Sequence, residues 1–118
     1  MYTYKCNVTR VIDGDTVDAS IDLGYDITIN KRIRLYGINT PECRTRDKEE
    51  KARGLFAKGR LIEILNEVNN QVIIHSTSIG KFGRVLGILY TDPTMLEYSC
   101  SVNMKLIKEN LATEYYGK

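Results

Sequence analysis

The strongest constraint on the fold is an alternation of apolar and polar side chains through residues 2–35, interrupted twice by turn residues. A period of two is typical of a strand with one buried face. Asp13-Gly14 predicts a type I′ hairpin turn with positive φ at both residues, and residues 24–26 predict a second turn. The segments 2–12, 16–23 and 27–35 are therefore expected to form three consecutive antiparallel strands.

The next segment predicts a helix. Asp47 with Glu50 three residues later fits a capping box, and an Asn-Asn pair at 69–70 can adopt the left-handed conformation of a C-cap. Phe56 lies off the apolar stripe of this helix, and the sequence gives no account of it. The stripe expected to face inward keeps helical spacing to the end and comprises Ala57, Leu61, Ile64, Leu65 and Val68.

The last part of the chain predicts two further strands and a second helix. Strands are expected at 71–76 and 85–91, and Ser101 can N-cap a helix over 102–109 that ends at Asn110. The order is then β-β-β-α-β-β-α, which is the order of the five-stranded OB-fold barrel. We therefore expect one domain over residues 1–118, of the α+β class and mainly β.

Composition adds few restrictions. The 118 residues and the apolar share of 42% suit one globular core, and a net charge of +2 neither indicates nor excludes a nucleic-acid partner. The three cysteines, Cys6, Cys43 and Cys100, lack zinc-site spacing and are expected to be free thiols in a reducing compartment. Without an apolar leader or a membrane-length apolar run, the expectation is a cytoplasmic protein with no membrane partner.

The segment 34–42 carries the first candidate chemistry. Arg34 ends a strand, Gly37 breaks it, and Pro41 stiffens the corner before Glu42. An arginine fork suits a phosphate, and a carboxylate can bind a hard cation or accept a proton from water. A plain ion pair between Arg34 and Glu42 is the alternative.

Asp15 follows the first predicted turn, which is complete without it. In a small barrel it can lie beside the end of the third strand, where Asn39, Thr40 and Glu42 are found. Such a cluster offers only oxygen ligands, which suits Ca²⁺, and Arg34 and Arg84 would face it. The loop 78–84 is open to two interpretations, a phosphate-facing turn or a solvated hairpin tip.

Three separated motifs resemble the staphylococcal nuclease (thermonuclease) family. They are Ile-Asp-Gly-Asp-Thr-Val at 12–17, Arg-Leu at 34–35 leading to Asn-Thr-Pro-Glu at 39–42, and Lys-Phe-Gly-Arg at 81–84. The Val-Asn pair at 102–103, followed by Leu-Ala at 111–112, is also similar to the family. The resemblance thus covers most of the chain.

The resemblance implies a Ca²⁺-dependent nuclease that hydrolyses DNA and RNA with low sequence specificity and leaves 3′-phosphates. By position, Asp15 and Asn39 would be metal ligands, and Thr40 would give its carbonyl to the metal. Glu42 would be the general base, and Arg34 and Arg84 would neutralise the phosphate. The positions of nucleotide contacts in the family correspond to Lys81 and Tyr116.

The chain departs from the family in three ways. Asn39 stands where a second aspartate ligand is typical, the hairpin over 17–31 is longer, and we expect the fold to lack the third C-terminal helix that the family has. Apolar surface normally under that helix would need another cover, such as the second subunit of a homodimer. Asn39 favours an alternative function, a catalytically weak or inactive OB-fold module that binds nucleic acid. Basic and aromatic residues near the predicted site favour single strands.

Overall fold

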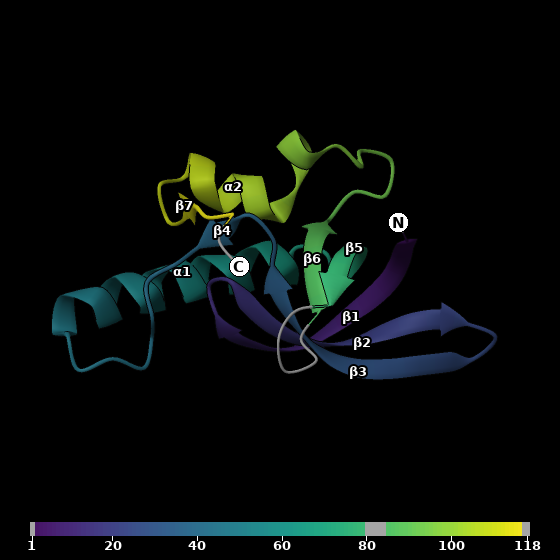
Figure 1. The fold of residues 1–118 in the computed structure, drawn as a ribbon, viewed down its shortest axis with the longest axis horizontal. Helices are drawn as coiled ribbons and strands as arrows, with labels where there is room; N and C mark the ends of the chain where they lie inside the picture. Colours follow the sequence, from purple (N-terminus) through teal and green to yellow (C-terminus); the bar gives the residue numbers. More distant parts are fainter. Residues whose placement is uncertain (1, 80–84, 117–118) are drawn as a thin grey trace.

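The fold is a closed barrel with two helices on one side of it (Figure 1). The computed structural model describes residues 2–79 and 85–116. The barrel strands are β1 (Tyr2–Asp13), β2 (Thr16–Gly24), β3 (Ile27–Leu35), β5 (Gln71–Ile79) and β6 (Val85–Tyr90). Their order is β1-β2-β3-β6-β5, with β5 pairing back to β1, and only the β3–β6 pair is parallel. The predicted five-stranded, mainly β barrel is confirmed.

Shorter elements complete the molecule. The helices are α1 (Lys48–Asn66) and α2 (Val102–Lys108), and a 3₁₀ turn, η2 (Tyr98–Cys100), precedes α2. A small second sheet joins β4 (Ile38–Asn39) to β7 (Thr113–Glu114). The sequence did not predict η2, β4 or β7, because elements of two or three residues are too short to show a period.

The helix ends follow local side-chain chemistry. Asp47 caps α1 by accepting hydrogen bonds from the backbone N–H groups of Glu49 and Glu50, and Ser101 caps α2. Asn69 and Asn70 both have positive φ after α1, as predicted. The capping box is only half formed, because the carboxylate of Glu50 accepts from the N–H of Glu42 and not from the cap residue.

The first hairpin turn is present, but its predicted type is wrong. Asp13 pairs with Thr16, so the central residues are Gly14 and Asp15, and neither has positive φ. A Cβ on Gly14 would lie 2.9 Å from the Cβ of Ala57 in α1. Gly14 is therefore required by the close approach of the helix rather than by the backbone conformation of the turn.

The core fills the barrel and the space beneath the helices. Its largest fully buried side chains are Ile33, Leu35, Ile38, Leu61, Leu65, Ile74, Leu89 and Leu106. The distal half of the β2–β3 hairpin extends beyond this core (Figure 1) and ends in a turn where Tyr25 is fully exposed. Leu23 and Ile27 alternate as expected for strands but lie beyond the core and are exposed.

The cysteines are free, as expected. Burial raises the pKa of the Cys6 thiol to about 12. Burial and the neighbouring Asp13 raise the pKa of the Cys43 thiol to about 11, so both thiols are neutral at physiological pH. Within residues 2–79 and 85–116, no helix combines the length and the apolar character needed to cross a membrane.

Candidate active site

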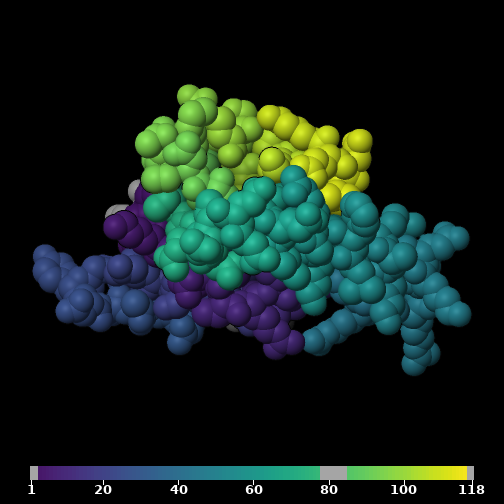
Figure 2. Space-filling model, turned by 180° about the vertical axis from the view of Figure 1, so that it is seen from behind, coloured from purple at the N-terminus to yellow at the C-terminus, as the bar shows by residue number. Residues whose placement is uncertain are grey.

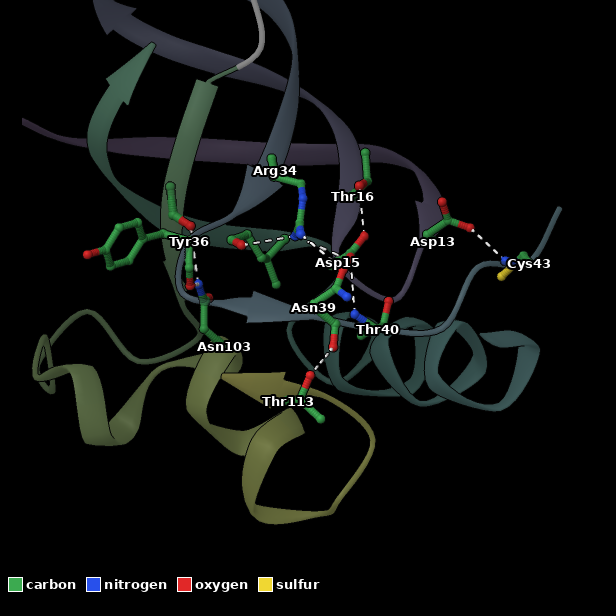
Figure 3. Close-up of polar contacts among 12 residues, drawn as sticks. Asp13, Asp15, Thr16, Arg34, Tyr36, Asn39, Thr40, Cys43, Asn103 and Thr113 are labelled. Carbon is green, nitrogen blue, oxygen red and sulfur yellow. Dashed lines mark hydrogen bonds and ion pairs between the residues drawn. The ribbon is translucent and has the colours of Figure 1, made fainter. Parts of the chain in front are cut away.

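Asp15 lies at the centre of the candidate site, in the turn between β1 and β2 (Figure 3). Its side chain is buried, and one carboxylate oxygen, Oδ1, accepts a hydrogen bond from Thr16 Oγ1 at 2.9 Å. The other oxygen, Oδ2, accepts from the backbone N–H of Thr40 at 3.0 Å. The carboxylate therefore joins the first hairpin to a segment 25 residues away in the sequence.

Arg34 extends from the end of β3 towards the same carboxylate (Figure 3). Its Nη1 lies 3.3 Å from Asp15 Oδ2, and its Nη2 donates to Asn39 Oδ1 at 3.3 Å. Both distances are at the long end for such contacts, and the side chain retains some exposure to solvent. The guanidinium thus bridges Asp15 and Asn39 through weak bonds that a phosphate could replace.

The small β4–β7 sheet positions Asn39 and Thr40. Asn39 pairs with Thr113, whose hydroxyl donates to the Asn39 carbonyl at 3.4 Å (Figure 3). Thr40 is buried, and its Oγ1 has no hydrogen-bond partner within the described residues. A buried hydroxyl without a partner is costly, so a polar ligand at this point would be stabilising.

Glu42 lies on the exposed turn that follows Pro41. Its carboxylate makes no hydrogen bond or ion pair within residues 2–79 and 85–116, so the alternative interpretation, an Arg34–Glu42 ion pair, does not hold there. Its backbone is held by α1, because its N–H donates to Glu50 Oε2 at 3.1 Å. A Cβ on Gly54 would lie 2.6 Å from the Glu42 carbonyl oxygen, so only glycine permits this approach of helix and turn.

Asn103 ties α2 to the strands beside the site (Figure 3). Its side chain is fully buried, and its Nδ2 donates to the carbonyls of Tyr36 and Gly87. Its Oδ1 accepts from the Leu89 N–H at 3.1 Å. This one amide thereby fixes the segment after Arg34 against β6, whose preceding residues carry the third motif.

An aromatic cluster lies beyond Gly37, which has a φ of +79° and ends the third strand as predicted. A Cβ there would lie 2.7 Å from Tyr98 Oη and 3.0 Å from Tyr116 Cε1. Tyr116 packs edge-on to Tyr36 with ring centroids 5.8 Å apart, and about half of its surface is exposed. Part of the Tyr116 side chain is therefore accessible to a ligand next to Gly37.

The structure brings together four of the predicted site residues: Asp15, Arg34, Asn39 and Thr40. Lys81 and Arg84 lie outside the described residues. Sequence reasoning missed Glu50, Gly54 and Asn103 as residues that hold this region. A glycine in the middle of a helix and an asparagine among apolar helix residues were the available signals.

The donor set fits a hard cation, although it is poor in charge. The hydrogen-bond acceptors that gather here are all oxygen atoms, and the buried Thr40 hydroxyl lacks a partner within the described residues, which suits Ca²⁺ better than softer metals. Asp15 already accepts three of the about four contacts that a carboxylate can accept. Within the described residues, no group of three or more acidic, histidine or cysteine side chains could hold a metal ion.

Comparison with known proteins agrees with this geometry. No curated protein matches the chain significantly. The family model described as staphylococcal nuclease homologue matches residues 32–118, which include Arg34, Asn39, Thr40 and Glu42. This match supports nuclease-type activity in general. Asp15 precedes the match, and its link to Thr40 comes from the structure. Because the match covers most of the chain, this protein belongs to the staphylococcal nuclease family.

Proposed function

We propose that this protein is a Ca²⁺-dependent endonuclease that hydrolyses phosphodiester bonds of DNA and RNA with low sequence specificity. The observation that carries the proposal is the convergence of Asp15, Arg34, Asn39 and Thr40 from three separate segments. A binding module would have no need for a buried carboxylate against an arginine at the same point. Family membership supports the same reaction class.

The proposed roles follow from the chemistry of each side chain. Asp15, the Asn39 amide and the Thr40 carbonyl would hold Ca²⁺, which when bound adds positive charge beside the phosphate. Glu42, exposed at a stiff corner, would take a proton from the attacking water. The water oxygen bonds to phosphorus, the bond to the 5′-oxygen breaks, and that oxygen takes up a proton.

Arg34 would stabilise the charge that builds on the phosphate. Its two 3.3 Å bonds can be exchanged for bidentate contacts with phosphate oxygens as the substrate binds. Arg84, which directly precedes β6 in the sequence, would share this role. Neither role suits lysine, which lacks the planar fork.

Substrate binding would use Lys81 and Tyr116. The half-exposed Tyr116 ring can stack on any base, and the lysine can contact a backbone phosphate. Stacking needs an unpaired base, so single strands should be preferred, and binding should weaken as salt rises.

A catalytically weak or inactive nucleic-acid-binding module is the second candidate. One observation favours it: Asn39 contributes no charge and accepts its hydrogen bond from Arg34. The site would then retain affinity for phosphate while binding metal too weakly to support cleavage.

The test is cleavage of single-stranded DNA by the purified chain with Ca²⁺ and with a chelator. We expect cleavage only with Ca²⁺, and losses of about a hundred- to a thousandfold for Arg34→Ala, Glu42→Ala and Arg84→Ala. Arg32→Ala is the matched control, because Arg32 lies on the same strand but pairs with Asp18 on the surface. Binding without cleavage would favour the second candidate. Near-normal cleavage by all three variants would refute the assignment of the site.

A further inference from the structure

The carboxylate of Glu42, the proposed general base, takes its position from the backbone alone. Glu42 lies on the exposed turn between β4 and α1, and among the described residues its carboxylate makes no hydrogen bond or ion pair. A general base must lie within hydrogen-bonding reach of the water from which it takes a proton. The groups that fix the Glu42 backbone therefore decide whether its carboxylate is in reach.

The N-terminal half of α1 holds the Glu42 backbone at two points. Figure 2 shows α1, in teal, along one side of the molecule, with its N-terminal end at the edge. The Glu42 carbonyl oxygen would lie 2.6 Å from a Cβ on Gly54, so the helix packs directly against it. The Glu42 N–H donates to Glu50 Oε2 at 3.1 Å. Packing limits only the distance, whereas a hydrogen bond also has a preferred direction, so Glu50 orients this peptide group.

Glu50 is available for this contact because another residue takes its usual one. A glutamate at the third position of a helix commonly accepts from the backbone N–H of the N-cap residue. Here the N–H of the N-cap residue, Asp47, donates to Thr45 Oγ1 at 3.3 Å instead. The Asp47 carboxylate accepts from the Glu50 N–H at 3.3 Å, which fixes the backbone of Glu50 in the first turn. The cap thus places the Glu50 carboxylate beside Glu42.

The neighbouring Glu49 shares every other property of Glu50 at this end of α1. Both are acidic residues of the first turn, where the helix dipole favours negative charge. The Glu49 N–H also donates to Asp47 Oδ1, at 3.0 Å. The Glu49 side chain is exposed, and its carboxylate makes no hydrogen bond or ion pair in the part of the chain that the structure describes. Only the bond to Glu42 distinguishes Glu50.

We propose that Glu50 is a positioning residue for the hydrolysis of the phosphodiester bond. Its carboxylate orients the Glu42 peptide group and thereby holds the Glu42 carboxylate where it takes the proton from the attacking water. Glu50 itself contacts neither the water nor the substrate. This inference rests on the proposed function, because it assigns a role to a residue that acts through the general base.

Steady-state cleavage of single-stranded DNA with Ca²⁺ tests the proposal. We expect Glu50→Ala to lower kcat by about tenfold, the worth of one hydrogen bond, and to leave KM unchanged. Glu50→Gln should retain most of the activity, because its amide oxygen can accept the same bond. Glu49→Ala is the matched control, since it removes the same charge from the same turn, and it should cleave as wild type does. Equal losses in Glu50→Ala and Glu49→Ala would overturn the proposal.

A double variant tests whether Glu50 acts through Glu42. Once Glu42 is replaced by alanine, the orientation of its peptide group no longer affects the reaction. The residual rate of E42A/E50A should therefore equal that of E42A, although E50A alone is slow. A further loss of about tenfold in the double variant would show that Glu50 acts independently of Glu42 and would overturn the proposal.

Amide hydrogen exchange of the full chain, without Ca²⁺ or DNA, measures the Glu42–Glu50 bond itself. The Glu42 N–H should exchange faster in Glu50→Ala than in wild type, and unchanged in Glu49→Ala. Faster exchange together with normal cleavage by Glu50→Ala would overturn the positioning role and leave the proposed function intact. Unchanged exchange in Glu50→Ala would show that the bond does not hold Glu42 and would also overturn it. A wild type that cleaves no DNA with Ca²⁺ would refute the proposed function and this role with it.

Discussion

Replacing Asn39 with aspartate adds a carboxylate to a cluster that holds only one buried carboxylate, that of Asp15. The amide oxygen of Asn39 lies 3.3 Å from Arg34 Nη2, and the same guanidinium lies 3.3 Å from Asp15. An isosteric carboxylate would therefore enter both the field of Arg34 and the proposed Ca²⁺ site without changing the packing of β4.

The size of the effect follows from competing contributions. Two unit charges 4 Å apart interact by about 4 kcal/mol at an effective dielectric near 20, and the cation carries two charges. Dehydration of the added carboxylate reduces this gain in Ca²⁺ binding energy. In the metal-free protein the carboxylate also pairs with Arg34 at an exposed position, which reduces the gain by up to about 1 kcal/mol more. We expect a net gain of roughly 1–3 kcal/mol, or about a ten- to hundredfold lower dissociation constant for Ca²⁺.

Calorimetric titration of Ca²⁺ into both proteins, with and without a non-cleavable oligonucleotide, measures this change directly. The wild type should bind weakly alone and more tightly with the oligonucleotide, whose phosphate supplies the missing charge. The variant should also cleave faster at limiting Ca²⁺. Asn30→Asp is the control, since it adds the same charge on the exposed arm of β3. Equal affinities would mean that Asn39 does not face the metal, and a tighter wild type would mean that the site is not built for Ca²⁺.

Three further predictions concern the support of the site and the thiols. Gly54→Ala should displace the Glu42 turn, slow cleavage and lower the free energy of unfolding by about 1–3 kcal/mol. Gly59→Ala, where a Cβ meets no neighbour, should instead raise the free energy of unfolding by up to about 1 kcal/mol. Urea denaturation and cleavage assays of both variants test this difference. Asn103→Ala should destabilise the protein by about 2–3 kcal/mol in urea, because the Tyr36 carbonyl and the Leu89 N–H lose their partner in the interior, while the Gly87 carbonyl keeps the Tyr36 N–H. A loss below about 1 kcal/mol would contradict this account. A thiol reagent at neutral pH should label Cys100 rapidly in the native protein, but Cys6 and Cys43 only after unfolding. Burial raises the pKa of these two thiols and keeps them protonated and unreactive. Equal labelling of all three would show that the core is open.

Much of the architecture was predictable from local patterns. The features that were predicted correctly depend on residues no more than a few positions apart in the sequence. They are the alternation of the strands, the inward stripe of α1 and the helix caps at Asp47, Asn69 and Ser101. Such spacings are written directly in the sequence. Asp15 and Arg34 were also recognisable, because one follows the first predicted turn and the other lies at the end of a predicted strand.

The order of the main strands and helices, and the residue types available for chemistry, can thus be derived from the amino-acid sequence. The partners of these residues depend on how the chain folds in three dimensions. Closure of the barrel places the Asp15 carboxylate against the Thr40 N–H. Because α1 packs against the Glu42 turn, the Glu50 carboxylate accepts a hydrogen bond from the Glu42 N–H and not from the N-cap residue Asp47. Gly14 was predicted for its backbone freedom but is needed for contact with Ala57. These outcomes depend on tertiary contacts between segments that are distant in the sequence, and the periodicity of a single segment does not reveal which other segment it contacts.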